Sequence, residues 1–89
     1  AEVYLYFPGG FGTFDELFEI LTLVQTKKIQ KVPIILVGSE FWKPFDDVIR
    51  KEMLENHQTI DEHDLSLYQI LDDEDAILEI VHNAPLREE

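Results

Sequence analysis

Residues 8–19, PGGFGTFDELFE, bring together the residue types that suit a phosphorylated ligand. Glycines let the backbone approach an anion closely, and the free amides at the start of a following helix favour phosphate. Thr13 adds a hydroxyl donor, and the glycines are Gly9, Gly10 and Gly12. Glu16 and Glu19 would share one face of that helix, where a carboxylate can stabilise positive charge or activate water. The segment therefore predicts a phosphate site with a carboxylate close by.

The same residues also have structural interpretations. Glycine turns between a strand and a helix are common, so the turn alone is also compatible with a tight loop. Thr13 with Glu16 has the spacing of a capping box, and Asp15 suits the first turn of a helix. The turn matches neither the nucleotide-binding P-loop, which ends in Lys-Ser or Lys-Thr, nor the dinucleotide fingerprint G-x-G-x-x-G.

Metal binding and base stacking by aromatic residues have weaker support in the sequence. The histidines, His57, His63 and His82, lack the helical pairing of a zinc site, and the chain has no cysteine, so we expect no metal. Residues 72–75, DDED, lack the glycine and terminal glutamate of a calcium loop and suit a helix N-terminus. Trp42 is expected in the core or at a subunit contact, and Tyr4 and Tyr6 in sheet packing.

The charge balance excludes one class of partner. Seven basic residues against nineteen acidic ones give a net charge of −12, so we expect no nucleic acid partner. No apolar run approaches the roughly 20 residues that cross a bilayer, and we expect no membrane partner. The lack of cysteine suits a reducing compartment, so the expected location is cytoplasmic. With 45% hydrophobic residues, the chain can bury the core of one small domain.

The hydrophobic pattern predicts three strands alternating with three helices. The expected strands are 1–7, 31–38 and 67–71, and the expected helices are 14–28, 43–56 and 72–84. Residues 57–66 are polar and predict a loop with a short helical turn. The expected inward residues are Phe45, Val48, Ile49 and Met53 on the second helix and Ala76, Ile77, Ile80 and Val81 on the third. The order βαβαβα predicts an α/β fold with a parallel sheet.

Two features predict contacts beyond this chain. A parallel sheet of three strands buried on both faces leaves open edges. The helix expected at 14–28 is apolar almost all round, so one stripe faces the sheet and another needs a further partner, such as a second subunit.

The string Pro8-Gly9-Gly10-x-Gly12-Thr13-x-x-Glu16 resembles the PGGxGTxxE motif of the LOG (LONELY GUY) family of phosphoribohydrolases, often labelled lysine decarboxylases. The resemblance continues through ELFEILTLVQTKKI, VPIILVGSEFW and LDDEDAILEIV. It covers nearly the whole chain but only the C-terminal part of a family member. It implies that residues 1–89 are the C-terminal part of a single Rossmann-like domain, without its N-terminal part, and that the protein is a dimer or larger homo-oligomer.

The resemblance also implies an activity. The family hydrolyses the N-glycosidic bond of a nucleoside 5′-monophosphate, such as AMP or a cytokinin nucleotide, without a metal or other cofactor. The products are the free base and ribose 5-phosphate. Carried onto this sequence, the phosphate contacts are Gly9, Gly10, Gly12 and Thr13. Glu16 is the catalytic acid, and Glu19 assists at the ribose or orients Glu16.

One departure from the family limits this expectation. The family also uses an arginine from the half before the motif, and neither Arg50 nor Arg87 matches it. We therefore expect the 89 residues alone to be inactive, and the site to be completed by the missing N-terminal half or a second chain. Two alternatives stay open: a non-catalytic module that binds a nucleotide or another phosphate ligand, and a fragment that serves only assembly.

Overall fold

The computed structural model describes residues 3–84, and its centre is a sheet of three parallel strands. The strands are β1 (Tyr4–Tyr6), β2 (Ile34–Val37) and β3 (Gln69–Leu71), in the order β1-β2-β3. Leu5 pairs with Ile35, and Ile35 pairs with Gln69. The expected α/β class is confirmed, since three parallel strands with flanking helices form a Rossmann-like arrangement.

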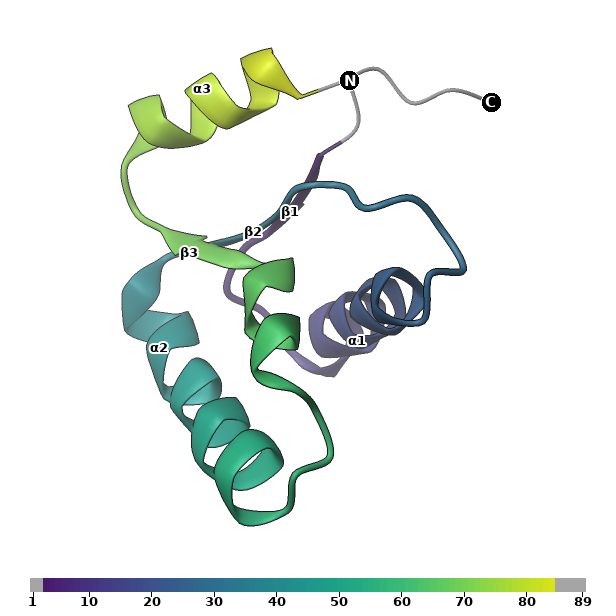
Figure 1. Ribbon diagram of the computed structural model, residues 1–89. Helices are drawn as coiled ribbons and strands as arrows, with labels where there is room; N and C mark the ends of the chain where they lie inside the picture. Colours follow the sequence, from purple (N-terminus) through teal and green to yellow (C-terminus); the bar gives the residue numbers. More distant parts are fainter. Residues whose placement is uncertain (1–2, 85–89) are drawn as a thin grey trace.

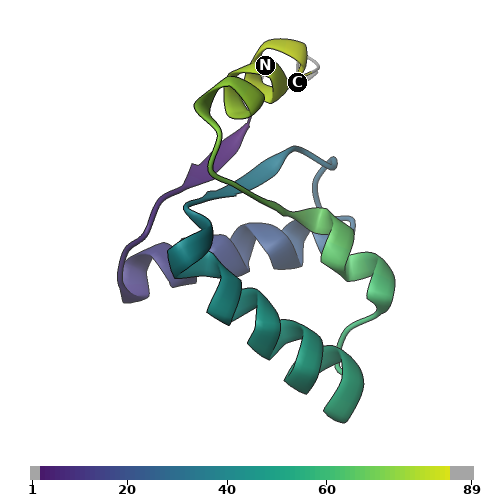
Figure 2. The ribbon, with the colours of Figure 1, turned by 90° about the vertical axis from the view of Figure 1, so that its left-hand side faces the viewer.

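Helices cover both faces of the sheet. Helices α1 (Phe11–Gln25) and α2 (Ser39–Val48) lie on one face, and α3 (Glu74–Asn83) lies on the other (Figures 1 and 2). Helix α2 continues without a break into a π-helix, η1 (Ile49–Asn56). A short 3-10 helix, η2 (Glu62–Leu67), precedes β3 and lies where a helical turn was expected.

The core lies between the sheet and the helices α1 and α2. Strand β2 is buried on both faces as expected, with Ile34, Ile35 and Leu36 at most 1% exposed. Trp42 is fully buried, which confirms its assignment to the core, and its ring packs at 5.3 Å from that of Phe14 between ring centres. Parallel strands need cover on both faces, and the central strand has it from α1 and α2 on one face and from α3 on the other (Figures 1 and 2).

Helix α1 begins three residues earlier than predicted. Its N-cap is Gly10, and the first backbone bond runs from the Phe14 amide to the Gly10 carbonyl at 3.3 Å. The expected Thr13–Glu16 capping box is therefore wrong, because both residues already lie inside the helix and no side chain caps its start. Asp15 likewise lies beyond the first turn.

Helix α2 also begins earlier than predicted, at Ser39 instead of Lys43 or Pro44. Pro44 lies inside the helix, although prolines favour the first helical turn. The added first turn includes Trp42, which lies with Asp46 on the inward face of the helix. Val48 lies off this face and is 54% exposed, so its predicted inward position is wrong.

The remaining members of the predicted stripes mostly agree with the structure. Ile49 is buried, and Phe45 and Met53 pack partly buried against the core. The stripe on α3 is half-buried at all four predicted positions, Ala76, Ile77, Ile80 and Val81. The expected burial of both faces of the first strand is wrong, since Leu5 is 39% exposed. Phe7, which was also expected in this strand, is 59% exposed and lies beyond the end of β1. Ala1, Glu2 and Arg87 lie outside the described residues.

A buried carboxylate ties α2 to the segment that enters β3. Asp46 is only 4% exposed and accepts a hydrogen bond from the Tyr68 hydroxyl at 2.5 Å. It accepts another from Arg50 Nε at 2.7 Å. Burial opposes ionisation of Asp46, but the bonds from Tyr68 and Arg50 outweigh it, so its pKa lies below the ordinary value. Burial and the bond to Asp46 raise the pKa of Tyr68.

None of the helices within residues 3–84 combines the length and the apolar character that crossing a bilayer requires.

Candidate functional site

The glycine turn lies at the carboxyl end of β1 and leads directly into α1. Gly9 is in close contact with Thr13, because a Cβ built on Gly9 would lie 2.2 Å from Thr13 Oγ1. Such a distance is impossible, so any larger residue at position 9 would displace the threonine. The turn therefore brings Gly9, Gly10 and Thr13 together at the helix start, as predicted for a phosphate site.

Gly10 and Gly12 face open space. A Cβ added to either residue would meet no atom within 4 Å, and neither has the positive φ that requires glycine. Gly10 is the N-cap of α1, a position where glycine is among the favoured residues. Nothing within residues 3–84 explains why Gly12, inside the helix, lacks a side chain. A ligand that approaches the backbone closely would explain it, because a side chain would then be in its way.

The start of α1 is also free of any capping side chain. Helix α3 is capped by Asp73, whose carboxylate accepts a hydrogen bond from the Asp75 amide at 3.0 Å. At the start of α2, the Ser39 amide donates to the Asp72 carboxylate at 2.6 Å. No side chain of the described residues caps α1 in this way, so its first amides and its positive dipole end can receive an anion.

The two candidate carboxylates lie together. Glu16 and Glu19 line one hollow of about 370 Å³ between α1 and β1, and Tyr4 and Tyr6 line it from the strand. The apolar part of its wall comes from Leu5, Ile20 and Leu23. No basic side chain of the described residues lines this hollow. The site thus has two neighbouring parts, an anion-binding turn and a carboxylate-lined hollow, because the glycines and Thr13 do not line the hollow.

Tyr6 has a place in the site that the sequence reasoning missed. Its hydroxyl donates a long hydrogen bond of 3.5 Å to the Glu16 carbonyl oxygen. Burial raises its pKa, and the negative charges of Glu16 and Glu19 add to that effect. The expected packing role in the sheet holds, since Tyr6 is buried in the core cluster. The alternation of Tyr4 and Tyr6 was the signal that both rings face the same helix.

Arg50 does not reach the candidate site. Its guanidinium pairs with Asp46 within the helical segment, which agrees with the expectation that it does not match the family's arginine. Arg87 lies outside the described residues.

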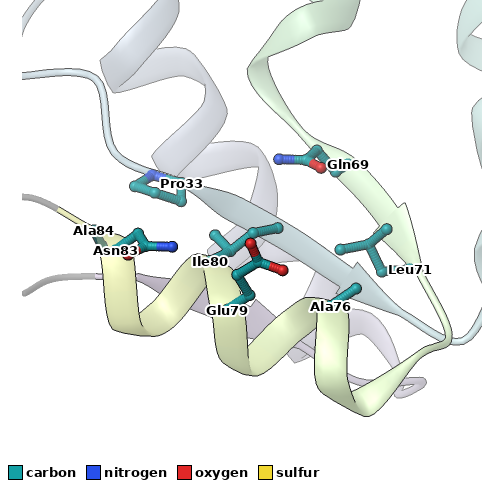
Figure 3. Close-up of a pocket in the computed structure, with 8 residues that line it drawn as sticks. All are labelled: Pro33, Gln69, Leu71, Ala76, Glu79, Ile80, Asn83 and Ala84. Carbon is teal, nitrogen blue, oxygen red and sulfur yellow. The ribbon is translucent and has the colours of Figure 1, made fainter.

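A second, larger hollow lies elsewhere. About 480 Å³ opens between α3 and strands β2 and β3, lined mainly by Pro33, Leu71, Ala76 and Ile80 (Figure 3). Glu79 and Asn83 stand on its helix side (Figure 3). None of the residues predicted for the site lines it, so it has no part in the candidate site.

The fold and the turn define a class before any comparison: an α/β protein with an open helix N-terminus beyond a parallel strand, where such folds bind ligands. The comparison with family models then identifies a family. The model described as "Possible lysine decarboxylase" matches residues 1–81. The chain therefore belongs to this family, the LOG family that its glycine motif resembles. A search of curated proteins found no match.

Proposed function

We propose that the protein is a nucleotide phosphoribohydrolase, which cleaves a nucleoside 5′-monophosphate such as AMP, or a cytokinin nucleotide, into free base and ribose 5-phosphate. One observation carries the proposal: an uncapped α1 N-terminus with two open glycines lies next to a hollow that contains Glu16 and Glu19. The 5′-phosphate binds the amides of Gly10 and Gly12 and the hydroxyl of Thr13, and the ribose then extends toward the two carboxylates.

The chemistry assigns different roles to the two glutamates. Departure of the base leaves positive charge on the ribose ring, and the Glu16 carboxylate stabilises that charge or activates the attacking water. Glu19 lies one turn further along α1 and binds ribose hydroxyls or orients Glu16.

The arginine that the LOG family uses from the half before the glycine motif has no counterpart at this hollow among the described residues. No basic side chain of the described residues lines the hollow, so we propose that a preceding segment or a second chain, as in a homodimer, supplies it. The 89 residues alone then bind the phosphate weakly and release no base. Release of adenine from AMP by the 89-residue chain alone would contradict this part of the proposal.

The activity is tested in a chimera that joins this chain to the preceding half of an active LOG family member. We expect release of adenine and ribose 5-phosphate from AMP. Glu16→Gln should lower this rate by about 100-fold or more, the scale of losing an acid–base group, with AMP affinity nearly unchanged. Asp15→Asn is the matched control, because Asp15 does not line the hollow.

Two outcomes would contradict the proposal, one the activity and the other the role of Glu16. A chimera that binds AMP without turnover would indicate the alternative, a non-catalytic nucleotide-binding module. A Glu16→Gln variant that keeps full activity would remove Glu16 from the catalytic role.

A further inference from the structure

The three loops that follow the strands are joined at the carboxyl edge of the sheet. Asp72, directly after β3, accepts two hydrogen bonds from Ser39, directly after Gly38 at the end of β2. The Ser39 amide donates to Oδ1 and the Ser39 hydroxyl donates to Oδ2, both at 2.6 Å. A third bond runs from the Gly38 amide to the Leu71 carbonyl oxygen at 3.0 Å. Charged acceptors make the stronger hydrogen bonds, so this junction is well defined.

The junction reaches the glycine turn through Gly38. Gly38 has φ of +101°, a conformation that residues with a side chain rarely adopt. Pro8 is the neighbour of Gly38 on its open side, since a Cβ built on Gly38 would lie at an ordinary van der Waals distance of 3.6 Å from Pro8 Cγ. Pro8 immediately precedes Gly9 and Gly10. Hydrogen bonds therefore join Asp72, Ser39 and Gly38 to the end of β3, and Pro8 places the glycine turn beside this junction.

We propose that Asp72 is a positioning residue for the phosphate site: it holds Ser39 and Gly38 against Pro8 and thereby sets the glycine turn in its binding geometry. This inference rests on the proposed function, because it assigns a role in binding the substrate phosphate. Asp72 does not touch the phosphate. It is exposed, and the bonds from the Ser39 hydroxyl and amide hold its pKa below the ordinary value, so it is ionised at neutral pH.

The direction in which removal of Asp72 changes the affinity for phosphate distinguishes a positioning role from charge repulsion alone. Asp72 is a negative charge at the same edge of the sheet as the site for a negative ligand. As a bystander it would repel the phosphate, and its removal would tighten binding or leave it unchanged. As a positioning residue it favours binding, and its removal weakens binding despite the loss of a repelling charge.

The test titrates AMP into the ¹⁵N-labelled 89-residue chain and follows the amide signals by NMR. We expect Asp72→Ala to weaken AMP binding about five- to tenfold, the effect of losing hydrogen bonds to a charged group. In the absence of AMP it should also shift the amide signals of Gly9 and Gly10. Ser39→Ala keeps the backbone bond and should weaken binding less, and Asp72→Asn, which keeps an oxygen for the Ser39 amide, should restore part of the affinity.

Asp73→Ala is the matched control. It removes the same charge one residue away and a helix cap, but Asp73 has no bond to Ser39. We expect unchanged AMP affinity in this variant, with some loss of stability. If Asp72→Ala binds AMP as well as or better than the parent chain, the positioning role is wrong. If the parent chain shows no AMP binding at about 10 mM, the phosphate site on which this inference rests is wrong, whereas hydrolysis itself is tested separately in the chimera. Unshifted Gly9 and Gly10 signals in free Asp72→Ala contradict the coupling itself.

Discussion

The three glycines of the turn differ in what they touch. Gly9 leaves room for Thr13, and a larger residue there would collide with a side chain of the same protein. Gly10 and Gly12 meet nothing within 4 Å and have no unusual backbone conformation. The folded chain thus requires glycine at position 9, whereas no steric contact requires it at positions 10 and 12, where the proposed ligand would need the space.

This difference predicts opposite effects on stability and binding at Gly12. Gly12 lies in the first turn of α1, so Gly12→Ala should raise the free energy of unfolding by up to about 1 kcal/mol. The same methyl group enters the space of the phosphate and should weaken AMP binding. Chemical denaturation and an AMP titration of the same variant measure the two quantities.

Gly9→Ala is the companion variant, and it should destabilise the fold because of the contact with Thr13. Tight AMP binding by Gly12→Ala would show that this glycine does not face the ligand.

The motif named the residues of the candidate site, but the sequence did not indicate which distant residues contact the loops around it. The glycines, Thr13 and Glu16 follow one another in sequence, so their spacing alone places them at a strand-to-helix turn. Asp72 was read only as part of an acidic helix start, because its bond partner Ser39 lies 33 residues away. Contacts at such separation leave no periodic pattern in a single sequence.

At the scale of elements, the helix ends show where local rules were insufficient. Both α1 and α2 begin at a glycine N-cap, Gly10 and Gly38, and both were predicted to begin later. Glycine is unfavourable inside a helix, so local propensity placed the start of α1 after the glycines, at Phe14. Proline is unfavourable in the interior but acceptable in the first turn, so the second helix was expected to start at Lys43 or Pro44. In the structure, the loop junction at Ser39 and the packing of Trp42 favour the earlier start of α2. The three strands and their alternation with helices along the chain were predictable, because each strand lies in a short, largely apolar run between helical patterns.

The C-terminal end of α1 contains a strained lysine. The Lys27 and Lys28 amides donate to the Val24 and Leu23 carbonyl oxygens at 3.1 and 2.8 Å, which is the Schellman arrangement. Lys27 adopts a φ of +59°, the left-handed conformation that glycine occupies without strain.

Lys27→Gly should therefore raise the free energy of unfolding by about 1 kcal/mol, because it removes this strain. Denaturant unfolding followed by circular dichroism measures the effect. Lys28→Gly removes the same charge at a position without positive φ and should not stabilise the chain. Equal effects of both substitutions would show that charge, and not backbone strain, is responsible.

At the scale of the whole molecule, the Asp46–Tyr68 bond joins α2 to the segment that enters β3. The pKa of Asp46 is lowered in the folded state, so its contribution to stability is present above the unfolded pKa of about 3.9. That contribution is lost as pH falls through the lower, folded pKa.

Tyr68→Phe should lower the free energy of unfolding at pH 7 by about 1–3 kcal/mol, since it removes the donor to Oδ1 of the buried carboxylate and leaves only the bond from Arg50 to Oδ2. The loss of stability between pH 5 and pH 3 should also be smaller in the variant, because the pKa of Asp46 is then less depressed. Urea unfolding across this pH range measures both effects. An unchanged pH dependence would mean that Tyr68 does not hold Asp46 in its ionised form.

The most direct test of the central claim maps AMP onto the chain by NMR. We expect saturable shifts of the amide signals of Gly9, Gly10, Gly12 and Thr13 with AMP and with ribose 5-phosphate, and none with adenosine. Even a site worth only about 3 kcal/mol would be half filled near 10 mM ligand. Equal shifts with adenosine, or no shifts at the turn at about 10 mM AMP, would contradict the assignment of the α1 N-terminus as the phosphate site.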